Sequence, residues 1–116
     1  MMMTNMTFTK GVGTPKYMAP EVLNKEKYKK PADIYSFAVT MLEVITWQNP
    51  FPRTIYRFAW DIANNVSEGR RQPIIKEVAN EGVRELIEQA WEQHPRDRAT
   101  IEHLVSGLER ELNKLL

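Results

Sequence analysis

The residue types that most often carry out chemistry are scarce in this chain. It contains no Cys, which excludes disulfides, zinc–thiolate sites, iron–sulfur clusters and a thiol nucleophile. The two histidines, His94 and His103, have no carboxylate pattern of metal-ligand spacing around them, so no metal site is predicted. What stands out is a run of turn residues, hydroxyls and one carboxylate, Gly-Thr-Pro-Lys-Tyr-Met-Ala-Pro-Glu, at positions 13–21. Function is therefore to be sought first in this run.

Composition narrows the class of protein that could carry such a run. The 116 residues, 42% hydrophobic and 27% charged, are typical of a globular chain of one domain or less. A net charge of +1 provides no long-range attraction to nucleic acid or to an anionic membrane. The N-terminus lacks a secretory signal, and the longest apolar stretch, 37–45, is interrupted by Thr40 and Glu43. We therefore expect no membrane contact and a cytoplasmic, intracellular protein.

The elements that must position the run are predicted to be helices. Residues 1–18 show no sustained period and are expected to be a loop, and Pro73 is expected to fix an extended piece within an irregular stretch at 70–79. Asn80 and Thr100 are suitable N-caps for two late helices, the second with a stripe of apolar residues. No strand is evident, so the fold class is mainly α. The expected helices cover 19–23, 31–48, 55–66, about 80–93 and 100 onwards, and the stripe on the last comprises Ile101, Leu104, Val105, Leu108, Leu112 and Leu115.

The helix at 31–48 is the strongest of these. Its apolar residues occupy more than half of the helical wheel. Asp33, Ser36, Thr40 and Glu43 form its single polar stripe. A helix that is apolar nearly all round belongs in the middle of a core. We therefore expect it to be the central helix of the fold.

The run at 13–21 resembles the end of the activation segment of eukaryotic protein kinases, where a substrate-docking loop is followed by the APE motif. Three later segments resemble the same family in the right order. Residues 33–39 resemble the start of the central helix of the kinase C-terminal lobe, 49–51 the loop after it, and 95–100 the turn that holds a late arginine. The resemblance covers 7–112, and Gly-Thr before Pro-Lys-Tyr is typical of serine/threonine or tyrosine-kinase-like members.

This resemblance implies part of a domain. Residues 1–18 would be an activation-segment-like loop, and 19–116 a partial C-terminal lobe. An intact family member transfers the γ-phosphate of ATP, with Mg²⁺, to Ser or Thr of proteins, and possibly to Tyr. The chain shows no glycine-rich loop, phosphate-binding lysine, catalytic loop or metal-binding aspartate motif, so the residues for ATP and Mg²⁺ are absent and the chain alone is expected to be inactive.

The resemblance also assigns roles to single residues. Gly13, Thr14, Tyr17 and Met18 would dock the substrate. Thr14 would support catalysis by framing the acceptor hydroxyl, and the alternative is a plain turn threonine. Tyr17 would shape the docking surface, or serve equally well as core filler.

Two further assignments concern charges. Glu21 and Arg98 would form the family's buried ion pair, the alternative being two surface charges of little energetic value. Asp33 would anchor the catalytic loop, or simply complement the dipole of its helix, and its side chain is expected to face inward. Thr4, Thr7 and Thr9 lie where activation-segment phosphorylation sites occur, and solvated loop threonines are the alternative.

Two functional classes remain open on this basis. The chain is either a fragment of an active protein kinase or a non-catalytic kinase-like binding or scaffold module. Its expected partners are a protein substrate or the missing remainder of a kinase domain, and not nucleic acid. Because part of the central helix would lack cover, we also expect marginal stability or self-association through an apolar surface beside Phe37 and Met41.

Overall fold

The computed structural model describes residues 15–26, 29–52 and 54–116. These residues form five α-helices and three short 3-10 turns without any strand, which confirms the predicted mainly α class. Of the predicted loop at 1–18, the first fourteen residues lie outside the described part and residues 15–17 form a turn. In chain order the elements are η2 (Pro15–Tyr17), α1 (Pro20–Leu23), α2 (Lys30–Thr46), α3 (Ala59–Ser67), η3 (Pro73–Glu77), α4 (Glu81–Ala90), η4 (Pro95–Asp97) and α5 (Ile101–Leu115).

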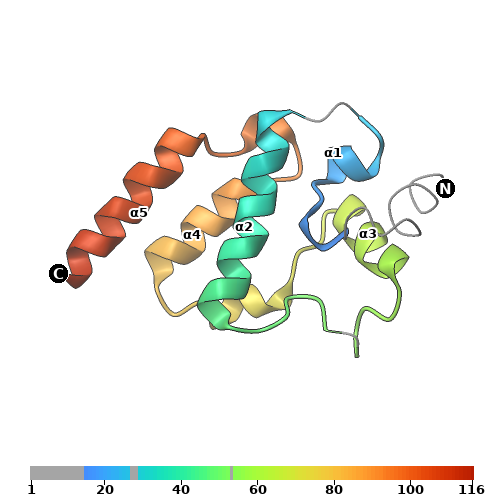
Figure 1. Cartoon of the computed structure of the whole chain (residues 1–116), viewed down its shortest axis with the longest axis horizontal. Coiled ribbons are helices and arrows are strands. Elements are labelled where there is room, and N and C mark those ends of the chain that lie inside the picture. Colours follow the sequence, from blue (N-terminus) through green and yellow to red (C-terminus); the bar gives the residue numbers. More distant parts are fainter. Residues whose placement is uncertain (1–14, 27–28, 53) are drawn as a thin grey trace.

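Helix α2 is the central element. Pro31 lies in its first turn, where the missing N–H is not needed for helical hydrogen bonds. The helix ends at Thr46, and the left-handed backbone of the next residue, Trp47 (φ 56°), turns the chain away shortly before two prolines. Figure 1 shows α4 packed beside α2, with α1 and α3 to one side and α5 to the other. The sequence therefore predicted this helix to within two residues at each end.

Helix α2 is buried along one side only. Tyr35, Ala38, Val39 and Leu42 are fully buried and form the middle of the core. Phe37 and Val44, on the opposite side, are 40% and 61% exposed. This agrees with the expectation that part of the central helix would lack cover, because none of the described elements packs over this side. A nearly all-apolar sequence does not show which side has a neighbour.

Met41, in contrast to Phe37, departs from the expectation. It was expected to lie beside Phe37 on an exposed apolar surface, but it is 8% exposed and belongs to the core. Four residues of α-helix turn through a little more than one full turn, and the edge of the buried side falls between these two side chains. The exposed apolar surface of α2 therefore consists of Phe37 and residues near the C-terminal end.

Two predictions for the segment 55–79 need correction. Helix α3 begins at Ala59, four residues later than predicted, because the N–H groups of Ile55 and Tyr56 bond back to the carbonyl of Pro52 and form a turn. The N–H of Phe58 then donates to Asp61 Oδ2 at 3.0 Å and starts the helix. The piece after Pro73 was expected to be extended, but it forms the 3-10 turn η3.

Both late helices begin at the predicted caps. The Asn80 side chain accepts from the N–H of Val83 at 3.0 Å, and the Thr100 hydroxyl accepts from the N–H of His103 at 3.1 Å. The apolar stripe of α5, by contrast, is largely not buried. Leu104 is buried, but most of the remaining stripe is exposed, because α5 packs on α4 through an adjacent side of the helix.

Candidate functional site

The segment from Pro15 to Glu21 is held to the helical body at its two ends. Its last residue, Glu21, lies in the first turn of α1, where the helix dipole favours a carboxylate. Arg98 follows η4, on backbone that Pro95 helps to fix. Its Nη1 and Nη2 donate to the two carboxylate oxygens of Glu21, each at 2.7 Å. The structure therefore brings this sequence-predicted pair together as a bidentate, buried ion pair.

Arg98 connects more than these two residues. Its remaining N–H groups donate to the carbonyl oxygens of Pro31 (2.9 Å), Glu92 (2.8 Å) and Gln93 (3.3 Å). These carbonyls lie at the start of α2 and in the connection after α4. One guanidinium therefore joins α1, α2 and the α4–η4 connection. Such a network makes a buried charge tolerable, since its donors are all used.

The electrostatics of Glu21 follow from this geometry. Burial alone would raise the pKa of the Glu21 carboxyl. The hydrogen bonds and charge of Arg98 outweigh burial, so the pKa of Glu21 lies below its ordinary value. Glu21 is therefore held as a carboxylate at neutral pH.

A second arginine, which sequence reasoning missed, lies beside the first. The guanidinium carbons of Arg71 and Arg98 lie 5.1 and 5.2 Å from the ring centroid of the fully buried Tyr35. Arg71 also donates to the carbonyl of Trp91 and to Gln93 Oε1, both at 2.9 Å. Burial raises the pKa of Tyr35 to about 12, so its hydroxyl stays neutral. Nothing in the irregular stretch 70–79 indicated that Arg71 would point inward.

The segment from Pro15 to Glu21, called the docking segment after the role that the kinase resemblance predicts for it, lies against α2. The Tyr17 hydroxyl donates to Glu43 Oε1 at 2.6 Å, and the Ser36 hydroxyl donates to the carbonyl of Tyr17, also at 2.6 Å. The Lys16 ammonium lies 3.9 Å from Glu43 Oε2. The hydrogen bond to Glu43, together with burial, raises the pKa of Tyr17 to about 12. Tyr17 is thus half-buried and fixed through its hydroxyl, and Met18 packs against the core beside it.

Glu43 and Ser36 are functional candidates that the sequence placed only in the polar stripe of the central helix. Their shared signal was that stripe itself, since its residues recur at spacings of three and four on one side of α2. The sequence alone assigned no partner to this stripe. In the structure both residues are half-buried, and they bind the docking segment.

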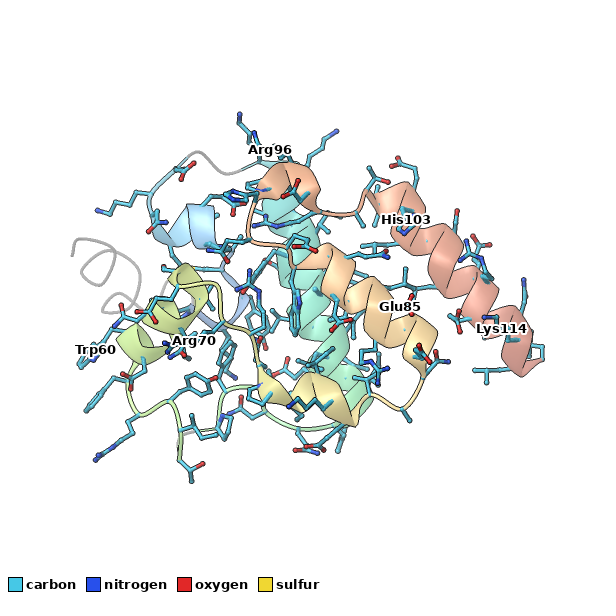
Figure 2. The ribbon with its side chains drawn as sticks, turned by 180° about the vertical axis from the view of Figure 1, so that it is seen from behind. Trp60, Arg70, Glu85, Arg96, His103 and Lys114 are labelled. Carbon is cyan, nitrogen blue, oxygen red and sulfur yellow. The ribbon has the colours of Figure 1, made fainter. Side chains whose placement is uncertain are left out.

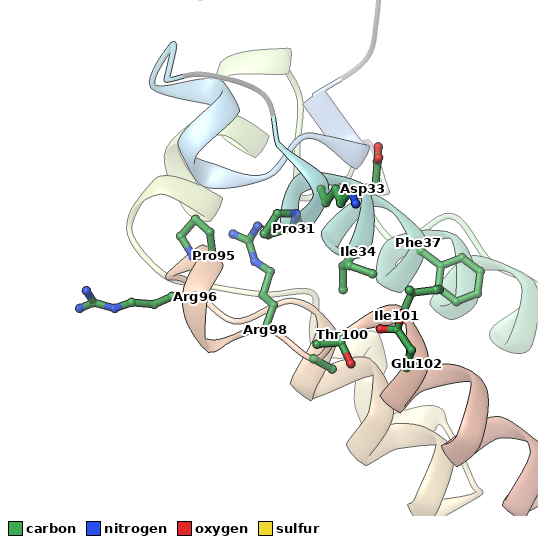
Figure 3. Close-up of a pocket in the computed structure, with 12 residues that line it drawn as sticks. Pro31, Asp33, Ile34, Phe37, Pro95, Arg96, Arg98, Thr100, Ile101 and Glu102 are labelled. Carbon is green, nitrogen blue, oxygen red and sulfur yellow. Dashed lines mark hydrogen bonds between the residues drawn. The ribbon is translucent and has the colours of Figure 1, made fainter.

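Other sequence-predicted site residues are not brought together. Gly13 and Thr14, and the possible phosphorylation sites Thr4, Thr7 and Thr9, lie outside the described residues. Asp33 is described and is exposed, so the expectation that its side chain faces inward is wrong. It lies in the first turn of α2, on the side that no described element covers, and Figure 3 shows it directed away from Ile34 and Arg98.

A pocket of about 660 Å³ opens beside Asp33, between the first turns of α2 and α5 (Figure 3). Its apolar lining comes chiefly from Ile34, Phe37 and Ile101, with Arg96 and Glu102 also on its wall. Within the described ranges, no three His, Asp or Glu side chains gather in a way that could hold a metal ion. Across the same ranges, none of the helices combines the length and apolarity needed to cross a membrane.

Comparison with known proteins agrees with this arrangement. The family model described as the protein kinase domain matches residues 1–107. The chain is 35% identical over 97 residues to the dual specificity protein kinase shkA of Dictyostelium discoideum, covering 84% of this chain and 18% of that protein. It is 31% identical over 98 residues to the probable serine/threonine-protein kinase drkC of the same organism, with 84% and 13% covered. Mitogen-activated protein kinase kinase kinase 7 of Bos taurus is 31% identical over 105 residues, with 88% and 17% covered.

The helical fold, with its docking segment and buried ion pair, is thus a portion of a kinase C-terminal lobe. The chain belongs to the protein kinase domain family. It spans less than a fifth of the length of these curated relatives.

The family implies ATP and Mg²⁺ in an intact protein. The described residues do not fit ATP and Mg²⁺. Phosphoryl transfer needs carboxylates that hold the metal and a lysine on the phosphates. The pocket beside Asp33 is instead largely apolar, and the described residues contain no metal-binding cluster. The described residues therefore lack the groups that would hold the nucleotide.

Proposed function

We propose that this chain is the substrate-docking and scaffold portion of a serine/threonine or dual-specificity protein kinase. The intact kinase would transfer the γ-phosphate of ATP to hydroxyl groups of proteins, and the chain alone would be inactive. The observation that carries the proposal is the fixation of the docking segment on α2 by Tyr17, Ser36 and Glu43, with the Glu21–Arg98 pair at its end.

This fixation suits the task of substrate docking. A kinase gains much of its rate by holding the acceptor hydroxyl in line with the phosphate, and small misplacements are costly. A segment tied to a buried helix at Tyr17 and to a buried arginine at Glu21 provides a surface of fixed position. In this proposal Thr14 frames the acceptor hydroxyl, and Gly13, Tyr17 and Met18 shape the surface around it. The substrate is a protein segment containing Ser or Thr.

The names of two curated relatives support Ser or Thr as the residue that is phosphorylated. They are a dual specificity kinase and a probable serine/threonine kinase, and Gly-Thr at 13–14 in this chain agrees with that class. The missing remainder of a kinase domain is the second partner that we propose, since it would supply the nucleotide site. The exposed side of α2 that carries Phe37 is available for such contact.

A chimaeric kinase tests the proposal. The 97-residue stretch of shkA that matches this chain is replaced by the corresponding stretch of this chain, and phosphorylation of casein is measured with MgATP. We expect measurable activity, and we expect Thr14→Ala to lower kcat by about tenfold or more while leaving KM for ATP unchanged.

Thermal stabilisation by MgATP serves as the folding control for this chimaera. A chimaera that MgATP stabilises normally but that phosphorylates nothing would contradict the proposal and favour a non-catalytic scaffold module. Equal activity with and without the Thr14 hydroxyl would contradict its assigned role.

A further inference from the structure

Helix α5 carries an apolar seam that the docking function does not use. Four of its members are large and exposed: Ile101 (51%), Val105 (47%), Leu112 (55%) and Leu115 (75%). Leu108, between them, is half-buried. The successive spacings are four, three, four and three residues, which is the a/d repeat of a coiled coil. The seam therefore has the pattern by which one helix recognises another.

The chain's own packing leaves this seam uncovered. Helix α5 rests on α4 through Leu104, Gly107 and Glu111, which are buried. Close approach of the helices is possible because Gly107 has no side chain where Leu86 packs, and the Glu111 carboxylate lies against Gly82 at the start of α4. These three contact residues lie on one side of the seam, about a quarter-turn of the helix away from it. The two surfaces of α5 are thus separate.

The seam also extends past the part shared with the family. The protein kinase model matches residues 1–107, whereas Leu112 and Leu115 follow this match. Half of the exposed apolar seam is therefore outside the common kinase domain.

Charge decides what chemistry fits the seam. Glu102 and Glu109 are exposed and lie seven residues apart along its outer edge, at positions equivalent to e of the heptad. The other edge, equivalent to g, is occupied by Leu104 and Glu111, which are turned onto α4. A partner helix can therefore form ion pairs only along the acidic edge. Its own flanking residues must be Lys or Arg.

A second copy of the chain does not fit this requirement. Two α5 helices packed antiparallel would place their acidic e edges against each other, which is repulsive. Packed parallel, each e edge would need the g edge of the other copy, and α4 already covers that edge. The surface is therefore suited to a different helix and not to itself.

We propose that the seam of α5 docks an amphipathic helix of a partner protein, with apolar residues at a/d spacing and a flanking row of Lys or Arg. This interaction goes beyond the proposed kinase function and does not rest on it. The seam spans about two heptads, or roughly 21 Å at 1.5 Å per residue. A contact of this length is smaller than a standard stable interface, so the docking is reversible.

Two synthetic helical peptides test the proposal with the 116-residue chain. Both are fluorescein-labelled and carry Leu at the a and d positions, one with Lys along the flank and the other with Glu. Binding is measured by fluorescence anisotropy at low salt. We expect the Lys peptide to bind about tenfold more tightly, because two attractive pairs of up to about 1 kcal/mol each are exchanged for repulsion.

Three variants of the chain sharpen this test. Leu112→Ser should weaken binding of the Lys peptide by about tenfold, and the double change Glu102→Lys with Glu109→Lys should reverse the preference toward the Glu peptide. Val44→Ser removes an equally exposed apolar side chain from α2 and should leave binding unchanged. Circular dichroism and thermal melting establish that each variant is folded. Because the charge reversal involves only exposed residues, it tests the seam even if Leu112→Ser unfolds.

Several outcomes would overturn the proposal. Equal affinity for the two peptides would show that the acidic edge does not select a basic partner. If neither peptide binds, the seam is not a docking site. Binding that Leu112→Ser leaves unchanged in a folded chain would place the peptide elsewhere. A dimer in sedimentation velocity that Leu112→Ser dissociates would show that a second copy covers the seam.

Discussion

Arg98 uses all five of its N–H donors on groups within the described chain. Two go to Glu21, and three go to carbonyl oxygens of Pro31, Glu92 and Gln93. A buried pair of this kind adds little net stability over an apolar replacement, but loss of one partner leaves an uncompensated buried charge. Arg98 is therefore important chiefly because its removal would leave the Glu21 carboxylate buried without a partner.

We predict that Arg98→Ala lowers the free energy of unfolding by about 3–5 kcal/mol, because the Glu21 carboxylate is left buried without its partner. Urea denaturation followed by circular dichroism measures the loss. Arg70→Ala is the matched control, because Arg70 pairs with Glu68 at 3.2 Å on the surface and its side chain is 67% exposed. That change should cost less than about 1 kcal/mol. Equal losses in the two variants would contradict a buried, coupled pair.

The pH dependence of stability should also reveal the ion pair of Glu21 and Arg98. The pKa of Glu21 is lowered in the folded state, so its contribution is complete above the unfolded value of 4.5 and is lost as pH falls below that value. We predict that stability falls less between pH 5 and pH 3 in Glu21→Gln than in the unmodified chain, although the variant is less stable at neutral pH. Melting temperatures across this range measure it, and parallel curves would contradict the assignment.

The sequence indicated some of these residues and not others. The pair of Glu21 and Arg98 followed from the resemblance to protein kinases, which ordered motifs around both residues carry. Arg71 had no such signal, because nothing local distinguishes a buried arginine from its exposed neighbour Arg70. Glu43 was recognised as polar, but only the fold shows that Tyr17 lies within hydrogen-bond distance of it.

At the scale of helices, the sequence predicted where helices begin better than it predicted which of their sides are buried. Side-chain caps at Asn80 and Thr100 depend on neighbouring residues and were found from sequence. The start of α3 was missed, because the turn formed by Ile55 and Tyr56 interrupts a pattern that otherwise reads as helix. The buried side of α5 was also missed, since its contact with α4 uses Gly107, a residue that hydrophobic patterns ignore.

We predict that Gly107→Ala destabilises the packing of α5 on α4. A Cβ atom at this position would lie 2.6 Å from Leu86 Cδ2, and Leu86 is itself buried. Alanine normally favours a helix over glycine, but overpacking of a core contact costs about 1–3 kcal/mol, so a net loss is expected. Ser106→Ala, at the exposed neighbouring position, is the control and should be neutral or slightly stabilising. A rise in melting temperature for Gly107→Ala would contradict the close approach of the helices.

At the scale of the whole molecule, the notable feature is how much apolar surface remains uncovered. The described residues extend over 47 × 31 × 22 Å, and α5 lies beside α4 at one edge of the helical body, as Figure 2 shows. Phe37 lines the pocket between α2 and α5 and is 40% exposed. We propose that the part of this surface on α2, around Phe37, makes the isolated chain prone to self-association; the pocket meets the seam of α5 at Ile101 and Glu102.

We predict that the chain binds the hydrophobic dye ANS and that Phe37→Ser reduces this binding by removing the aromatic wall of the pocket. The same change should lower the fraction of oligomer seen in sedimentation velocity. Trp47→Ser is the control, since Trp47 is 86% exposed but lies outside this pocket. If Phe37→Ser leaves the ANS fluorescence unchanged, the exposed apolar surface that binds the dye does not lie in this pocket.

The separation of Glu21 and Arg98 has a consequence for biosynthesis. The two residues stand 77 positions apart, so the ribosome makes the carboxylate long before its guanidinium. At about 5–20 residues per second, the interval is roughly 4–15 s. During that time Glu21 stays a hydrated carboxylate, because burying it without a partner would be costly. The helices can therefore close around Glu21 only after synthesis has passed residue 98.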